Sequence, residues 1–180
     1  MQIHFKEITK KSEDYKKVKE LYKTAFPKEE QIPFFIMISK IKKDNVKFYS
    51  IFDSSTWVGF VYLINYKDLS YVFYFAISDD SRGKGYGGAT LKALKEAYPS
   101  SRFFLAIEEI DSKYDNYRQR VSRKAFYEKN GFQLLNQKMY ESGVVYDLMG
   151  TDGKVDADLF DIMLKDYLGV FYKLIKTYIF

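Results

Sequence analysis

The stretch SDDSRGKGYGG, residues 78–88, carries four glycines and two basic side chains within eleven positions. It follows an apolar segment and precedes GGATLKALKEAY, residues 87–98, whose apolar side chains recur at helical spacing. A helix start leaves backbone N–H groups without intrahelical acceptors, and glycines there let an anion approach them closely. The stretch therefore predicts a phosphate-binding turn between a strand and a helix, although glycines also serve simple tight turns.

Two known phosphate motifs come close to this stretch. Gly83, Gly85 and Gly88 satisfy the dinucleotide pattern G-x-G-x-x-G, and Glu108 or Glu109 follows about 20 residues later. In a dinucleotide fold the first glycine follows its strand almost directly, whereas SDDSR intervenes here. The P-loop pattern needs a Lys-Ser or Lys-Thr pair, which does not follow these glycines. The sequence therefore disfavours both nucleotide folds.

The segments around the glycines predict a mixed sheet. Residues 46–52, 56–66 and 70–78 read as strands, because they are rich in aromatic and β-branched side chains and are separated by the short turns DSS and KDL. Turns this short predict antiparallel hairpins. The helix at 87–98 is stopped by Pro99 and followed by a strand at 102–110, so a right-handed parallel crossover is expected.

The remaining elements complete an α+β pattern. A strand is expected at 3–8, a helix at 15–26, a helix near 118–130, and strands at 132–140 and 144–150. One more amphipathic helix is predicted to end the chain. Its apolar stripe comprises residues 160, 163, 164, 167, 168, 171, 174, 175 and 178.

Composition excludes several kinds of chemistry. The 180 residues suffice for one domain, there is no cysteine, and the single histidine is His4. Disulfides and thiol nucleophiles are therefore excluded, and no metal site is expected. The formal charge of +5 is spread along the chain, which suits a phosphate-bearing ligand better than nucleic acid. The first residues lack the apolar region of a signal peptide, so a cytoplasmic location is expected.

The pattern Arg82-x-x-Gly85-x-Gly87, after a strand and at the head of a helix, resembles the acetyl-CoA signature of the GNAT acyltransferase superfamily. AFYEKNGF, residues 125–132, is similar to the second motif of that family and lies at the expected distance downstream. The resemblance covers roughly residues 1–150 in element order.

The resemblance implies a GNAT-like fold with a mixed, mainly antiparallel central sheet flanked by helices. Residues 1–150 would form the acetyltransferase domain. Residues 151–180 would be a C-terminal helical extension, packed on the same domain or on a partner subunit. A homodimer is one expected arrangement of the second kind.

The resemblance also implies acetyl-CoA as the cosubstrate. Main-chain amides of the loop would hold its pyrophosphate, with added charge from two side chains, and the end of the preceding strand would pair with the pantetheine arm. The implied loop residues are Arg82, Gly83, Lys84, Gly85, Tyr86 and Gly87, and the implied strand residues are Phe75, Ala76 and Ile77.

Two residues are candidates for the chemistry. Tyr127 aligns with a tyrosine that often serves as general acid in the family, and this role is favoured over the alternative that it only packs its helix against the sheet. Alternation along the strand sends the carboxylates of Glu108 and Glu109 to opposite faces, so that one of them faces the cleft. Glu108 is favoured over Glu109 as the general base. A carboxylate at this position could instead orient a cationic acceptor while water removes the proton.

The chain departs from the family pattern at Arg120, in a segment that carries two further arginines. Many members have an asparagine seven residues before the motif tyrosine, where this chain has Arg120. Arg118, Arg120 and Arg123 could reach a phosphate, but a solvated face is expected of them.

The sequence therefore predicts an acetyl-CoA-dependent N-acetyltransferase acting on a primary amine of a small molecule or peptide. Glu29 and Glu30 could attract that amine, or could serve solvation alone. The alternatives are a non-catalytic acyl-CoA-binding module of the same fold and a single-stranded RNA-binding domain. Neither nucleic acid nor a membrane is an expected partner.

Overall fold

The computed structural model describes residues 1–141, 143–174 and 177–180. The chain forms two compact units. The first comprises Met1–Ile64 and Val72–Pro99, and the second comprises Asn65–Tyr71 and Ser100–Phe180. The strand order is β1 (Ile3–Glu7), β2 (Val46–Asp53), β3 (Thr56–Tyr66), β4 (Leu69–Ile77), β5 (Arg102–Glu108), β7 (Val144–Gly150), β6 (Gln133–Glu141) and β8 (Thr177–Ile179).

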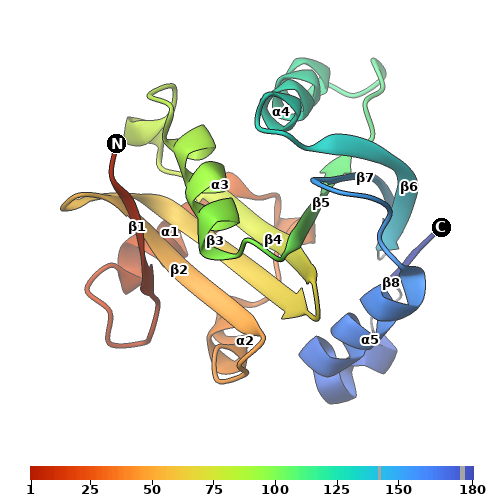
Figure 1. The fold of residues 1–180 in the computed structure, drawn as a ribbon, viewed down its shortest axis with the longest axis horizontal. Coiled ribbons are helices and arrows are strands. Elements are labelled where there is room, and N and C mark those ends of the chain that lie inside the picture. Colours follow the sequence, from red (N-terminus) through yellow and green to blue (C-terminus); the bar gives the residue numbers. More distant parts are fainter. Residues whose placement is uncertain (142, 175–176) are drawn as a thin grey trace. The chain divides into compact units, whose positions relative to one another are not determined.

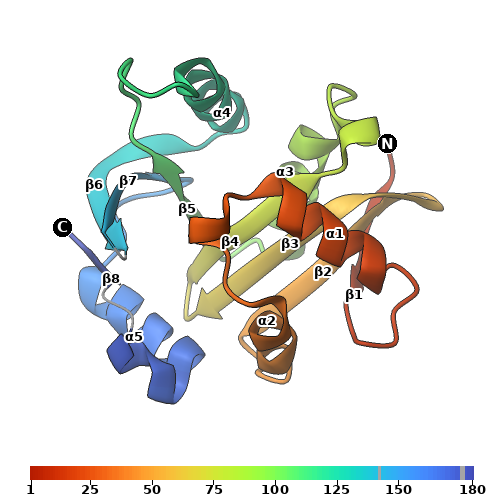
Figure 2. The ribbon, with the colours of Figure 1, turned by 180° about the vertical axis from the view of Figure 1, so that it is seen from behind.

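The first unit is a set of antiparallel strands with helices on both faces. Strand β1 pairs with β2, and β2 pairs with β3. Helix α3 covers one face of these strands, and α1 and α2 cover the other (Figures 1 and 2). The elements that begin in this unit are β1 (Ile3–Glu7), α1 (Tyr15–Ala25), the short helix η1 (Lys28–Glu30), α2 (Phe34–Lys40), β2 (Val46–Asp53), β3 (Thr56–Tyr66), η2 (Asp79–Ser81) and α3 (Tyr86–Ala97).

Strand β4 (Leu69–Ile77) contributes to both units. Its last six residues belong to the first unit, where the aromatic core lies. In that core Phe48 meets Phe60 and Tyr62 edge to face, with ring centroids 5.7 and 5.0 Å apart. Residues 58–64 of β3 are all buried, because helices cover both faces of the strand.

The second unit is built on the start of β4. Leu69–Tyr71 pair in parallel with Arg102–Phe104, β7 pairs antiparallel with β5 and β6, and β8 pairs antiparallel with β6. Phe160 lies edge-on to Tyr71 and Phe104, whose rings stack with centroids 4.7 Å apart. The further elements are β5 (Arg102–Glu108), α4 (Tyr117–Lys129), β6 (Gln133–Glu141), β7 (Val144–Gly150), α5 (Ala157–Leu168), η3 (Gly169–Leu174) and β8 (Thr177–Ile179).

The predicted mixed, mainly antiparallel sheet with flanking helices is confirmed, including the parallel pairing of β4 with β5. The terminal helix is present but shorter than its apolar stripe. It ends at Leu168 because Gly169 adopts φ 59° and ψ −127°, a conformation that leaves the helix. Stripe positions 171 and 174 lie in η3, position 178 lies in β8, and position 175 lies outside the described residues.

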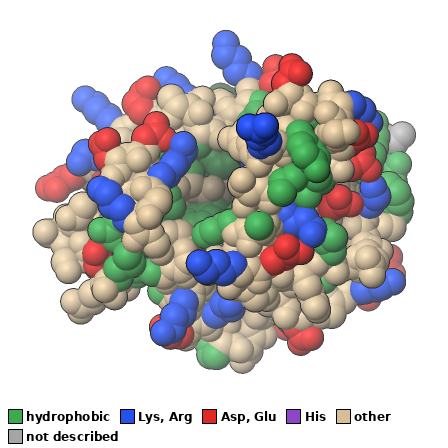
Figure 3. Space-filling view, turned by 90° about the horizontal axis from the view of Figure 1, so that it is seen from above, with side chains coloured by type: hydrophobic (Ala, Val, Ile, Leu, Met, Phe, Trp, Pro, Cys, Tyr) green, Lys and Arg blue, Asp and Glu red, His purple; other side chains and the backbone are tan. Residues whose placement is uncertain are grey.

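Residues 151–180 therefore supply a strand as well as a helix to the second unit. The division of the chain at residue 150 stays a prediction. Among the described residues, no helix is long and apolar enough to cross a bilayer. Figure 3 shows basic and acidic side chains interspersed over one face, in keeping with a charge spread along the chain.

Candidate functional site

The loop after β4 is held by its own backbone and by Arg82. The amide of Ser78 donates to the carbonyl of Val58 at 2.9 Å, which ties the end of β4 to β3. Arg82 donates from Nε to the Ile77 carbonyl at 3.1 Å, and its guanidinium lies 2.7 Å from a carboxylate oxygen of Asp79. Arg82 thus braces the strand end and the turn that follows it.

The glycines open the backbone where α3 begins. Gly83 and Gly85 have φ of 73° and 86°, the left-handed region in which a side chain is strained. The first intrahelical hydrogen bond of α3 runs from the amide of Ala89 to the carbonyl of Gly85, at 3.1 Å. The amides of the residues just before Ala89 are those that a helix start leaves without intrahelical acceptors.

Lys84 adds a cation to this loop. Its side chain is exposed, and it forms no ion pair among the residues that the structure describes. A pyrophosphate needs hydrogen-bond donors and positive charge, which a helix N-terminus, its unpaired backbone amides and a lysine can provide. The residues present therefore fit the phosphates of acetyl-CoA.

Gly59 is a residue that sequence reasoning missed. A Cβ placed on Gly59 would lie 2.2 Å from the carbonyl oxygen of Ala76 and 3.0 Å from Cα of Ile77. The end of β4 therefore approaches β3 so closely that only glycine fits. The signal was a lone glycine inside an otherwise aromatic and β-branched strand, which often marks a close backbone approach.

Two tyrosines fix the connection between α1 and α2 beside β4. The hydroxyl of Tyr74 donates to the Glu30 carbonyl at 2.6 Å and accepts from the amide of Ile32 at 3.2 Å. The hydroxyl of Tyr22 donates to the Ile32 carbonyl at 2.8 Å. Glu29 is exposed on this connection, next to the half-exposed Glu30.

In the second unit, Glu108 ends β5 inside a cluster of donors from α4. Its side chain is 11% exposed. One carboxylate oxygen accepts from Asn116 Nδ2 at 3.1 Å, and the other is paired with Arg123. Arg120 Nε lies 3.7 Å from the first oxygen. Both oxygens of Glu108 are therefore engaged.

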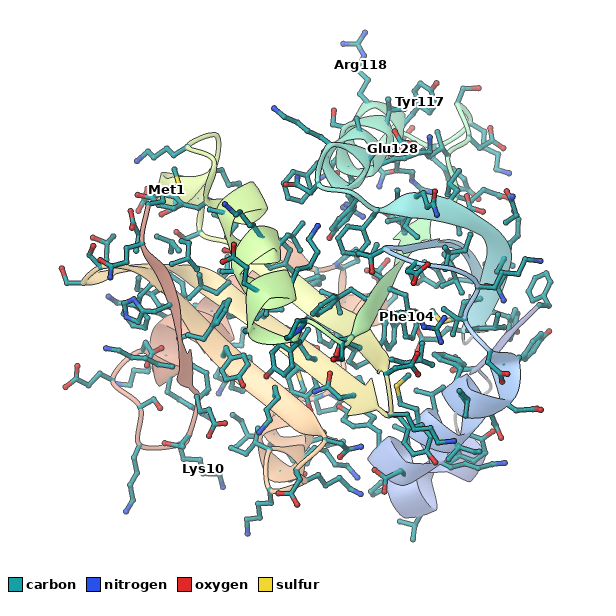
Figure 4. The ribbon with its side chains drawn as sticks, in the orientation of Figure 1. Met1, Lys10, Phe104, Tyr117, Arg118 and Glu128 are labelled. Carbon is teal, nitrogen blue, oxygen red and sulfur yellow. The ribbon has the colours of Figure 1, made fainter. Side chains whose placement is uncertain are left out.

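The expectation of a solvated arginine face is wrong for Arg120, and Arg123, although 37% exposed, is paired with a carboxylate. Arg120 is 13% exposed, donates to the Glu109 carbonyl at 2.7 Å and lies 3.8 Å from the centre of the Tyr114 ring. Arg123 pairs with Glu108, as described. Arg118 does point away from α4, as Figure 4 shows. Arg120 and Arg123 both contact the buried carboxylate of Glu108 on β5. The sequence around the arginines does not indicate this partner.

Glu109 and Glu108 contact different elements, in agreement with the predicted alternation. The carboxylate of Glu109 accepts from Lys138 of β6 at 2.6 Å, and this contact lowers its pKa.

Tyr127 lies on α4 with its ring against Phe126 and Phe132, at centroid distances of 5.1 and 5.6 Å. Within the described residues its hydroxyl has no hydrogen-bond partner. Burial raises the pKa of Tyr127 to about 12, and the positive charge of Arg123 opposes that rise. The phenol is therefore protonated at neutral pH and free to donate.

The first unit thus holds the predicted cofactor residues from Phe75 to Gly87, and the second holds Glu108 and Tyr127. A model of the acetyltransferase (GNAT) domain matches residues 44–134, half of the chain. The chain belongs to the GNAT acetyltransferase family. The matched range includes the glycine loop, Gly59 and the two catalytic candidates.

Solved structures of GNAT proteins share this fold. A protein from Bacteroides thetaiotaomicron assigned to the GNAT family is 28% identical, with 95% of each chain covered and a TM-score of 0.70. An aminoglycoside 6'-N-acetyltransferase in complex with coenzyme A is 16% identical, with 87% of this chain and 100% of that chain covered and a TM-score of 0.61.

The ribosomal-protein-S18-alanine N-acetyltransferase from Escherichia coli is 13% identical, with 87% and 97% covered and a TM-score of 0.61. At these last two identities the likeness concerns the fold alone. No curated protein matches the sequence.

Proposed function

We propose that this GNAT protein is an N-acetyltransferase that uses acetyl-CoA and acetylates a primary amine of a small molecule or a peptide. The observation that carries the proposal is the loop at residues 83–88. Its left-handed glycines precede the first intrahelical amide of α3 and leave a row of backbone donors for a pyrophosphate.

Acetyl-CoA supplies an acetyl group that is activated as a thioester. The chain has to bind the phosphates, present a donor to the oxygen on which charge develops, and deliver a proton to the departing sulfur. We assign the first task to the loop amides and Lys84, and the second to the backbone near Ala76. No histidine or cysteine is needed, and the chain offers one histidine and no cysteine.

Tyr127 is the proposed proton donor. An ordinary thiol has a pKa of about 8.5, so a phenol with a pKa of about 12 transfers its proton fully only at a cost of about 5 kcal/mol. Any group that lowers the pKa of Tyr127 therefore assists the step.

Glu108 as the general base stays a prediction. Because Asn116 and Arg123 engage its two oxygens, it could accept a proton only after one of them withdrew. Proton loss to water, with Glu108 contributing only its fixed charge, is the alternative.

The acceptor is proposed at the level of a class. Structures with this fold carry names as different as aminoglycoside and ribosomal-protein-alanine acetyltransferases. The exposed Glu29, on a connection that Tyr74 holds beside β4, would attract a protonated amine. An acceptor panel should therefore include a polyamine, an aminoglycoside and peptides with free N-termini.

Binding is tested first, by thermal-shift titration with acetyl-CoA, desulfo-CoA, ATP and NAD at fixed salt. Acetyl-CoA is expected to raise the melting temperature by mass action, with little effect of ATP or NAD. Gly83→Ala should weaken the response. Gly153→Ala is the matched control, because Gly153 also has a positive φ, 58°, and lies in the other unit. A shift with NAD but not with acetyl-CoA would refute the proposal.

Turnover is tested by thiol release with the acceptor panel. Tyr127→Phe should lower kcat about 100-fold or more, the usual contribution of a general acid. Tyr117→Phe on the same helix, whose ring is exposed, should leave kcat unchanged. Acyl-CoA binding without turnover on any amine would favour the non-catalytic module. Strongly salt-dependent binding of single-stranded RNA, without acyl-CoA binding, would favour the RNA-binding alternative.

A further inference from the structure

Four side chains of α4 and its N-cap form one stripe. Asn116, Arg120, Arg123 and Tyr127 are spaced by four, three and four residues, which places them on a single face of the helix. The first three contact Glu108 at the end of β5. The stripe therefore continues from the buried carboxylate to the hydroxyl-bearing ring of Tyr127.

Arg123 is the link in this stripe. It pairs with Glu108 and lies one helical turn before Tyr127. Its side chain is 37% exposed, whereas that of Glu108 is 11% exposed, so the pair is partly withdrawn from water and weakly screened. Asn116 and Arg120 complete the contacts of the carboxylate. A network in which each member is satisfied is rigid.

We propose that Arg123 is a positioning residue for Tyr127 and that Glu108 acts as its anchor. The inference rests on the proposed acetyltransferase function. The anchored pair ties α4 to the end of β5, and it keeps a positive charge one helical turn before Tyr127. As that O–H bond breaks and an S–H bond forms on the leaving thiolate, the electron pair stays on the phenolate oxygen, and Arg123 stabilises it.

Within the described part of the chain, the other groups around Tyr127 do not supply a positive charge to stabilise its phenolate. Phe126 from the same helix and Phe132 at the start of the next strand present apolar rings. Glu108, from β5, is paired with Arg123. Lys124, three residues before Tyr127 on the same helix, pairs with Glu128 at 2.7 Å. The positive charge of Arg123 opposes the increase in the pKa of Tyr127 that burial causes.

A double-mutant cycle tests the inference. Arg123→Gln should lower kcat several-fold, because loss of the charge leaves the effect of burial unopposed and makes the phenol a weaker acid, and it should leave KM for acetyl-CoA unchanged. Arg123→Lys should restore most of kcat, because it keeps the charge. In the Tyr127→Phe background, Arg123→Gln should have no further effect, since the phenol that it assists is gone. Arg118→Gln is the control, as Arg118 points away from α4.

A purely structural role predicts equal losses of kcat in both backgrounds, which would overturn the inference while leaving the acetyltransferase intact. Arg123→Lys keeps the test open if Arg123→Gln does not fold, because a lysine variant as impaired as Tyr127→Phe would also contradict a role for the charge. No turnover by the unaltered protein on any amine would overturn both the proposed function and this inference.

The variant Glu108→Gln distinguishes the anchoring role of Glu108 from a role as general base. Glutamine can still accept a hydrogen bond from Arg123, so an anchoring Glu108 predicts that Glu108→Gln keeps at least about a third of kcat. A general base predicts a loss of about 100-fold or more and the disappearance of the acidic limb of the pH profile. The second result would overturn the anchoring role.

Discussion

The close approach of β4 to β3 at Gly59 should make Gly59→Ala the most informative substitution in the first unit. Gly59 pairs with Ile51 of β2 on one side, directly before a shift in register, and faces the Ala76 carbonyl on the other. The added methyl group would have to displace the end of β4. That segment contains the proposed pantetheine-binding residues Phe75, Ala76 and Ile77.

The size of the displacement follows from the structure. A Cβ on Gly59 would lie 2.2 Å from the Ala76 oxygen, whereas Cβ contacts under 3.0 Å essentially never occur. The two backbones must therefore separate by at least 0.8 Å, the difference between these two distances. Overpacking of this kind costs about 1–3 kcal/mol, partly offset by about 0.4–1 kcal/mol from the stiffer unfolded chain.

Gly59→Ala should lower acetyl-CoA binding and kcat/KM by more than its small loss of stability would explain. A misplacement of about 1 Å near reacting groups can lower activity about 100-fold. The measurements are the melting temperature, the thermal shift with acetyl-CoA, and kcat/KM for thiol release well below the melting transition. Val61→Ala is the matched control, because Val61 is fully buried in the same strand and its register partner is Tyr49 of β2. Its stability cost should be about 1–3 kcal/mol.

Gly59→Ala and Val61→Ala should differ in acetyl-CoA binding and in kcat/KM at similar stability. If Gly59→Ala binds acetyl-CoA and turns over as well as Val61→Ala does, the geometry at Ala76 has no part in cofactor binding. If Gly59→Ala is more stable than the unaltered protein, the close approach itself is wrong.

Two further predictions concern stability. Arg102 lowers the pKa of Asp68 through a contact of 2.7 Å, so this pair stabilises the fold above the ordinary carboxyl pKa of about 4, and the contribution is lost as the pH falls through the lowered value. Because Asp68 is half exposed, Asp68→Asn should lower the free energy of unfolding by less than about 1 kcal/mol at pH 7 and should not lower it near pH 2. Urea titration measures both values. The ion pair would be contradicted if the variant and the unaltered protein differed by the same free energy at both pH values. Phe160→Ala should cost about 3–5 kcal/mol, because its buried ring fills the space beside Tyr71 and Phe104, while Phe171→Ala, on a half-exposed ring, should cost less than about 0.5 kcal/mol in the same titration. Equal costs would show that α5 does not depend on the Phe160 contact.

The parts of the fold that depend on neighbouring residues could be predicted from the sequence. The turns DSS and KDL are too short to join parallel strands, and the helix after the glycines was expected at 87–98 and lies at Tyr86–Ala97. The left-handed conformations of Gly83 and Gly85 have the same local origin, since only glycine adopts them without strain. The end of the last helix was missed although Gly169 was visible, because the apolar stripe continues past it at the same spacing into η3 and β8.

The environment of each candidate catalytic side chain could not be predicted in this way. Charge and spacing alone favoured a solvated face for Arg120 and Arg123, yet both contact Glu108, which is 12 and 15 residues earlier in the chain. The need for glycine at position 59 likewise depends on Ala76, on another strand.

The sequence by itself therefore determined the order of elements, the glycine turn after β4 and the family of this protein, because backbone conformation and hydrophobic periodicity act over a few residues. Only the tertiary structure decided which side chains meet. The anchoring of Arg123 by Glu108, the raised pKa of Tyr127 and the close approach at Gly59 arise where segments far apart in the sequence share buried space. In such space desolvation and steric fit, which no local pattern records, determine the chemistry.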